Sequence, residues 1–307
     1  MSKLAHHWKV RLSVVVLLVL LCVGASWLKN RAEPKLVMLQ VAPVVPSPIL
    51  PSNRIVAYYG NFYSKKMGVL GEYPPDQVLS MLKQTVAEWQ VADPNVPVIP
   101  AIHYIAVAAQ AGPGRDGRYR LRMPADQINK AIDMAKQING LVFLDVQVGQ
   151  SDVATEVPLL EPYLKQPNVE LAIDPEFAMH AGAKPGTIIG SLDATDVNFA
   201  INYLAHLVQE NHLPPKILVV HRFTTNMLTH VEDIHLVPEV QLVICMDGFG
   251  PPVLKKQVYH DVIEVAPVQF TGFKLFFKND ALILGSHMMT PKEILKLHPV
   301  PLYIQYQ

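Results

Sequence analysis

Cysteine is scarce in this chain, and its scarcity excludes two kinds of structure. Only 2 cysteines occur among the 307 residues, so a zinc site with four cysteine ligands is excluded by count. Cys22 lies in an apolar N-terminal run, and Cys245 lies in an expected buried strand. A disulfide between them is therefore not expected.

Several catalytic signatures and an excess of charge are also missing. The sequence has no Gly-x-Ser-x-Gly elbow, P-loop, dinucleotide-binding fingerprint or His-Glu-x-x-His pair. We therefore predict no cofactor. The 26 Lys and Arg residues balance the 26 Asp and Glu residues. Since proteins that bind nucleic acid need basic surfaces to neutralise phosphates, nucleic acid is not an expected partner.

The first 31 residues are predicted to be an export segment. A basic stretch, residues 1–11, precedes an apolar run at residues 12–28, which is the pattern of an export signal. The run is near the lower limit of about 17–25 residues for a spanning helix. An uncleaved membrane anchor is slightly favoured over cleavage after Ala25. The body is then expected on the outer, periplasmic or extracellular side of the cytoplasmic membrane, or secreted if the signal is cleaved.

The remainder divides into a tether and one large domain. Residues 32–53 are rich in proline, which indicates an extended linker. Residues 54–307 leave about 255 residues for a body, the typical size of one (β/α)₈ barrel. Half of the whole chain is hydrophobic, at 50%, so a large buried core is possible.

Eight short apolar runs in the body predict eight strands, with helical patterns in most of the gaps. These runs are residues 55–59, 96–102, 141–145, 169–174, 216–220, 240–246, 271–277 and 302–305. Helices are expected over residues 76–92, 125–138, 193–211 and 290–297. We therefore predict an α/β fold, a closed TIM-like (β/α)₈ barrel. An open doubly wound sheet is the alternative, and helical pattern is weakest after the fifth and sixth strands.

Two neighbouring strands end in acids. Asp145 closes the third strand with Gln147 two residues later, and Asp174 closes the fourth with Glu176 two residues later. Because alternate residues of a strand share a face, each pair is expected to point the same way. The carboxyl ends of barrel strands carry the usual site of chemistry, so these four side chains are predicted to face one mouth.

Other strand ends add polar groups to the same mouth. Asp247 shares a face with Cys245, and His221 shares a face with Val219. Tyr59, His103 and Gln305 lie at further strand ends, where the facing direction is less well defined. Aromatic faces for sugar rings are available at Tyr58, Tyr59, Phe62, Tyr63 and Phe249.

Paired acids suit glycosidic cleavage. Two close carboxyl groups push one pKa upward, which gives one proton donor and one anion, and glycosidases need both. We predict Glu176 as proton donor and Asp174 or Asp247 as base or nucleophile. The remaining mouth residues are predicted to hold substrate or tune the acids, namely Asp145, Gln147, His221, Tyr59 and His103.

Less specific interpretations stand beside this one. In these interpretations Asp174 only closes its strand by bonding loop amides, and Asp247-Gly-Phe-Gly is only a tight turn. A non-catalytic glycan-binding or envelope-assembly protein on the same barrel is the alternative function. A hydrolase dependent on a divalent metal ranks third, because the acids and histidines at the mouth are possible ligands; we predict no metal.

Several sequence blocks occur in an order that is similar to a known family. They are AYYG (57–60), GVLGE (68–72), LDVQVG (144–149), LAIDPEF (171–177), KILVVHRF (216–223), DGFG (247–250) and the final YQ (306–307). The chain resembles a family of exported bacterial proteins, often lipoproteins or membrane-anchored, with a glycoside-hydrolase-like TIM barrel and no established activity. The resemblance covers residues 54–307 and implies a polysaccharide or oligosaccharide ligand.

Overall fold

The centre of the protein is a closed parallel barrel. In the computed structural model, which describes residues 48–180 and 182–307, each barrel strand pairs in parallel with both neighbours. The eight barrel strands, in order around the barrel, are β1 (Arg54–Gly60), β11 (Tyr303–Tyr306), β10 (Phe270–Leu275), β9 (Val240–Met246), β7 (Lys216–Arg222), β5 (Val169–Ile173), β4 (Leu141–Val146) and β2 (Val98–Ala109). Pairing of β1 with β2 closes the ring, so the predicted barrel is confirmed and the open sheet is excluded.

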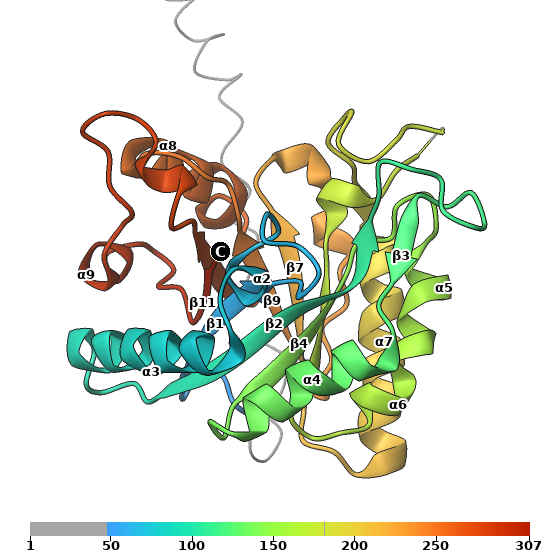
Figure 1. Cartoon of the computed structure of the whole chain (residues 1–307), viewed down its shortest axis with the longest axis horizontal. Coiled ribbons are helices and arrows are strands. Elements are labelled where there is room, and N and C mark those ends of the chain that lie inside the picture. The colour runs from blue at the N-terminus through green and yellow to red at the C-terminus, as the bar shows by residue number, and fades with distance from the viewer. Residues whose placement is uncertain (1–47, 181) are drawn as a thin grey trace, which may run out of the picture. The chain divides into compact units, whose positions relative to one another are not determined.

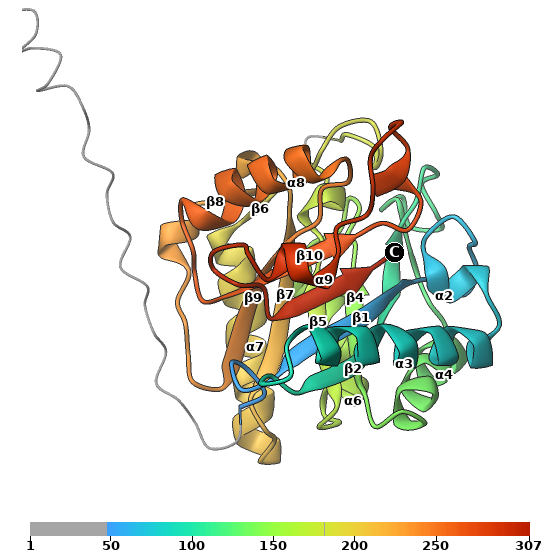
Figure 2. The same cartoon turned by 90° about the vertical axis from the view of Figure 1, so that its left-hand side faces the viewer.

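Helices cover the outside of this barrel, as Figures 1 and 2 show. The α-helices are α2 (Val69–Glu72), α3 (Pro75–Ala92), α4 (Ala125–Lys136), α5 (Val153–Glu156), α6 (Glu161–Leu164), α7 (Ala194–Asn211), α8 (Pro252–Tyr259) and α9 (Pro291–Ile294). Proline begins α3, and a capping box formed by Asp193 and Asp196 begins α7. The three long helices lie where they were predicted, whereas α9 is shorter than expected.

The two gaps with weak helical pattern, after the fifth and sixth barrel strands, differ in structure. Between β7 and β9 the chain forms only 3₁₀ turns and the short strand β8 (Leu228–Thr229), which pairs with β6 (Leu192–Asp193). After β9 it does form a helix, α8, which continues as a π-helical turn at His260–Glu264. The weak helical pattern was thus a good guide in the first gap and a poor one in the second.

Strand β2 extends beyond the predicted end at residue 102. It continues to Ala109 because its last residues pair antiparallel with β3 (Arg120–Arg122). Both arginines of β3 form ion pairs with the fully buried carboxylate of Glu156, with N–O distances of 2.7 Å. These ion pairs therefore hold the β2–β3 hairpin against α5.

Alternation along the strands divides the core into two layers. Outward residues such as Leu171 and Ile173 pack with the helices, while a smaller cluster fills the barrel. The buried residues of that inner cluster are Leu50, Ile55, Ala57, Ala101, Leu141, Phe143, Ala172, Ile217, Val219, Val243, Cys245 and Tyr303. Leu50 belongs to the predicted linker, and the side-chain amide of Gln241 holds its backbone N–H and C=O.

The predicted export segment at residues 1–31, and the linker as far as residue 47, lie outside the described residues. Within the described part of the chain, no helix has the length and apolar character needed to cross a membrane.

Candidate functional site

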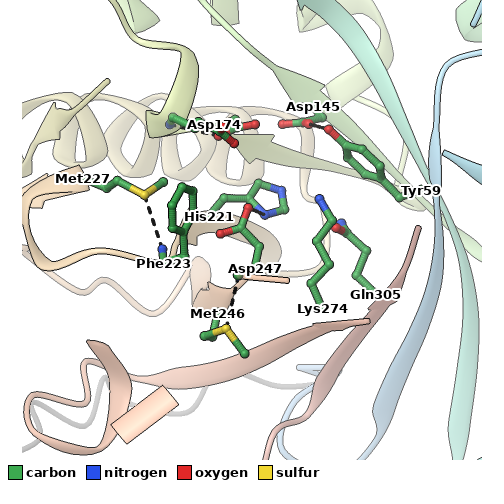
Figure 3. A network of polar contacts seen from close by, with 12 residues as sticks. Tyr59, Asp145, Asp174, His221, Phe223, Met227, Met246, Asp247, Lys274 and Gln305 are labelled. Carbon is green, nitrogen blue, oxygen red and sulfur yellow. Dashed lines mark hydrogen bonds and ion pairs between the residues drawn. The ribbon is translucent and has the colours of Figure 1, made fainter. Parts of the chain in front are cut away.

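Polar side chains replace the apolar inner layer at the carboxyl ends of the strands. These inward-facing and buried residues are Tyr59, His103, Asp145, Gln147, Asp174, His221, Asp247, Lys274 and Gln305. The strand-alternation argument placed Asp145, Asp174, His221 and Asp247 on the inner faces, and the structure has them there, above Phe143, Ala172, Val219 and Cys245. Figure 3 shows four of these side chains, from different strands, around one space.

The first part of this network joins Tyr59, Asp145 and His103. The Tyr59 hydroxyl donates to Asp145 Oδ2 at 3.1 Å, and His103 Nε2 lies 3.8 Å from the same oxygen, longer than a hydrogen bond. Burial lowers the pKa of His103 to about 4, despite the neighbouring carboxylate. Burial alone would raise the pKa of Asp145, but His103 and the cations nearby reverse this, and the net shift is downward.

Asp174 closes its strand by bonding a loop amide. Its Oδ1 accepts from the backbone N–H of Glu176 at 3.0 Å, and its Oδ2 accepts from Gln147 Nε2 at 3.3 Å. Burial raises the pKa of Asp174 well above its usual value, and repulsion from Asp145 and Asp247 adds to the rise, although His221 opposes it. A neutral carboxyl that holds the following turn is thus one clear role of Asp174.

Glu176 reaches the mouth by a route that alternation did not predict. Strand β5 ends at Ile173, and Pro175–Phe177 form a 3₁₀ turn, so the expected strand geometry does not extend to Glu176. Its side chain nevertheless lines the pocket described below. Burial raises the pKa of Glu176, and the nearby Asp247 carboxylate raises it further.

His221 and Asp247 form a buried ion pair. His221 Nδ1 lies 3.4 Å from Asp247 Oδ2, and both side chains are almost fully buried. Burial lowers the pKa of His221, but Asp247 outweighs that effect, and the net pKa is well above the usual range. The turn interpretation of residues 247–250 also has support, since Gly250 has a φ of 135°, a conformation that favours glycine.

Sequence reasoning did not select Lys274, although it lies at the centre of the site. Its Nζ lies 3.9 Å from the centre of the Tyr59 ring, a cation–π contact. In Figure 3 its amine points into the space between Asp145, His221 and Asp247. A charged residue within the otherwise apolar run of β10 was the available signal.

Part of this polar network lines a pocket of about 690 Å³. Its acidic and basic lining residues are Lys66, Asp174, Glu176, Asp247 and Lys274. Its aromatic lining consists of Tyr59, Phe177, Phe223, Phe249 and Phe276. Most ligand pockets combine such apolar surface with a few polar groups.

Some predicted residues lie elsewhere. Tyr58 points outward and bonds Thr85, Phe62 stacks on Tyr104 at 4.7 Å between ring centroids, and Tyr63 is 62% exposed. Of the five aromatic residues proposed as sugar platforms, only Tyr59 and Phe249 line the pocket. Tyr58 departs because it neighbours Tyr59 in β1, where adjacent side chains face opposite layers.

Asp145, His103 and His221 also fall outside the pocket lining. They are fully buried and lie behind Tyr59, Gln147 and Asp247. A ligand in the pocket would therefore not contact these three side chains directly.

Comparison with known proteins assigns neither a family nor an activity to this chain. No known protein family matches the sequence, and no curated protein is detectably similar. One structure with some similarity is the cellulase Cel5C_n, at 12% identity and a TM-score of 0.45, covering 83% of this chain and 75% of that one. Another is a GH18 chitinase from Pseudoalteromonas aurantia, at 11% identity and a TM-score of 0.31, covering 83% and 94%. Neither likeness assigns chemistry to this chain, and the proposed family membership stays a prediction.

Proposed function

We propose that the protein hydrolyses glycosidic bonds of a cell-envelope or extracellular polysaccharide at the barrel mouth. The observation that carries the proposal is the presence of Glu176 and Asp247 in one pocket that aromatic rings also line. The raised pKa of Glu176, caused by burial and then by Asp247, indicates that the two carboxyl groups interact. Glycosidases need such a pair, with one group protonated and the other charged.

In this proposal Glu176 gives its proton to the leaving glycosidic oxygen. Asp247 either attacks the anomeric carbon or removes a proton from the water that attacks it, so that one water is added overall. Asp247 is favoured over Asp174 for this role because both oxygens of Asp174 already accept hydrogen bonds. Asp174 becomes a positioning residue, since it holds the turn that carries Glu176.

The pocket wall supplies the groups that would hold a sugar. Tyr59, Gln147 and Lys274 present polar groups at the floor, and Phe177 and Phe249 offer apolar faces. Asp145, His103 and His221 support this floor from below. The extracytoplasmic location predicted from residues 12–28 is part of the same proposal.

The test is release of reducing ends by the purified full chain from cello-oligosaccharides, chito-oligosaccharides and peptidoglycan fragments. Glu176→Gln and Asp247→Asn are expected to lower release at least 100-fold, while circular dichroism stays unchanged. Glu232→Gln, at an exposed acid, is the matched control and should retain full activity. The proposal is refuted if both site variants remain fully active. Saturable binding without release by the wild type would instead support a non-catalytic glycan-binding protein.

A further inference from the structure

Three side chains of metal-binding type converge beneath the pocket floor. His103 from β2, Asp145 from β4 and His221 from β7 each offer one ligand atom, and these atoms lie within 4.8 Å of one another. All three residues are fully buried at 0% exposure. They come from three separate barrel strands, whose spacing fixes them as a rigid cluster.

The cluster contains polar atoms that the described protein does not satisfy. His103 Nε2, Asp145 Oδ1 and both ring nitrogens of His221 are buried and have no hydrogen-bond partner among the described residues. Buried polar groups in folded proteins are almost always paired, with protein, water or an ion. Two imidazoles and a carboxylate around one point are complementary to a metal cation once His221 has released its second proton.

The opposite edges of both imidazoles are already oriented by neighbours. His103 Nδ1 lies 2.5 Å from the Tyr303 hydroxyl and 3.0 Å from the Gln305 carboxamide. His221 Nδ1 lies 3.4 Å from Asp247 Oδ2. Histidines that bind metal usually donate their second N–H to such a carboxylate or polar group. With Nδ1 as donor in each ring, Nε2 of neutral His103 keeps a free lone pair, and Nε2 of protonated His221 gains one when binding of the ion displaces its proton.

Gln305 completes this arrangement after one change of orientation. Its Oε1 is buried without a partner, whereas its Nε2 faces His103 Nδ1. Turning the carboxamide by a half-rotation exchanges these two atoms, which are nearly equivalent in shape. Oε1 then accepts from Nδ1–H of His103, and Nε2 of that ring is left for a ligand.

We propose that His103, Asp145 and His221 bind one divalent transition-metal ion, Zn²⁺ above all, through the two Nε2 atoms and an Asp145 oxygen. Two imidazoles and one carboxylate are ligands that zinc takes readily, whereas Mg²⁺ and Ca²⁺ favour sites built from oxygen alone. His103 Nε2 and Asp145 Oδ2 are 3.8 Å apart, and the three ligand atoms lie within 4.8 Å of one another. To reach tetrahedral zinc distances this pair must approach by about half an ångström, and the most distant pair by up to about 1.5 Å.

The surroundings carry charges of both signs. Asp145 and the adjacent Asp247 supply two negative charges, which face the Lys274 amine as well as the ion, and Tyr59 donates a hydrogen bond to Asp145 Oδ2. The Tyr59 ring lies over the cluster, with its centroid 5.2 Å from that of His103 and 6.3 Å from that of His221. The ion would thus link three strands under the pocket floor, and its binding is independent of whether the pocket cleaves glycans.

Metal titration of the purified full chain tests the proposal directly. After dialysis against a chelator, Co²⁺ and Zn²⁺ are expected to bind with a stoichiometry of one, and Co²⁺ is expected to give a visible absorption band. Zn²⁺ should raise the melting temperature, because it binds the folded state preferentially. Mg²⁺ at the same concentration is expected to have no effect.

Variants assign the ligands. His103→Gln and His221→Gln are each expected to weaken Zn²⁺ binding at least 100-fold, and Asp247→Asn about 10-fold through orientation of His221. His206→Gln, at an exposed histidine, should bind as the wild type does. The proposal is overturned if the wild type binds neither ion at micromolar concentration, or if both ligand variants bind normally. Should those variants not fold, X-ray absorption of the wild-type zinc complex decides: two imidazoles support the site, and none refutes it.

Discussion

The buried ion pair between Lys255 of α8 and Asp280 leads to a specific prediction about the free energy of unfolding. Lys255 Nζ donates to Asp280 and also to the carbonyl oxygens of Gly248 and Lys274, at 2.9 and 2.7 Å. The Asp280 carboxylate additionally accepts the backbone N–H groups of Gly250 and Phe276, each at 3.0 Å. One pair thereby fixes both segments that carry Asp247 and Lys274 to the pocket.

Replacing either residue of this ion pair alone should lower the free energy of unfolding substantially. Both side chains are at most 1% exposed, and breaking a buried pair typically costs about 3–5 kcal/mol because the remaining charge is uncompensated. Asp280→Leu also leaves two buried amides without acceptors, so its loss should lie at the upper end of that range. Lys255→Met should lie at the lower end, since the amides keep their partner.

Replacing both residues by apolar ones of similar volume should cost much less than the sum of the single changes. For Lys255→Met with Asp280→Leu we expect a coupling of about 2 kcal/mol or more, because no isolated charge remains. The assay is urea unfolding followed by circular dichroism, with the exposed Lys256→Met as control, expected within about 0.5 kcal/mol of wild type. Additive losses, or singles that cost less than about 1 kcal/mol, would refute the reasoning.

Two further predictions concern the pH dependence of stability and the loop after β4. Because the pKa of His103 is about 4 in the folded protein but about 6.5 when unfolded, the unfolded state takes up its proton first on acidification; stability should fall by about 3 kcal/mol between pH 6.5 and 4. In urea unfolding at several pH values, His103→Gln should reduce this loss of stability on acidification, whereas the exposed His206→Gln should leave it unchanged. An equal loss of stability in both variants would show that His103 is not its source. A Cβ on Gly149, which has a φ of 60°, would lie 2.6 Å from two backbone oxygens, so Gly149→Ala should cost more than about 2 kcal/mol. Gly117→Ala, with a φ of 75° and open space, should cost only about 1 kcal/mol; equal losses in the two would show that backbone strain alone is responsible.

The barrel was predictable because its signals are local. Each buried strand is a short apolar run, and strict alternation decides which residues face the axis. Asp145, His221 and Asp247 were placed correctly for that reason alone. Glu176 shows the limit of the rule, because the strand ends three residues before it and a turn takes over.

Long-range partners had no local signal. The hydrogen bond between Tyr59 and Asp145 joins residues 86 positions apart. No pattern in the sequence around either residue predicts that the two side chains meet. Lys274 had only the weak signal of one charge in a largely apolar run, and nothing in that run indicates which side chains it meets. The same holds for Asp280, whose charge is explained only by Lys255 from another segment.

The position of Leu50 has a consequence for how the protein can be presented to a large ligand. Leu50 seals the amino-terminal end of the barrel through its bonds to Gln241, whereas the pocket opens at the carboxyl ends of the strands. The described chain therefore begins at the end of the barrel opposite the pocket. Attachment to a solid support or a surface through that end would leave the mouth facing outward, free to receive an extended polymer.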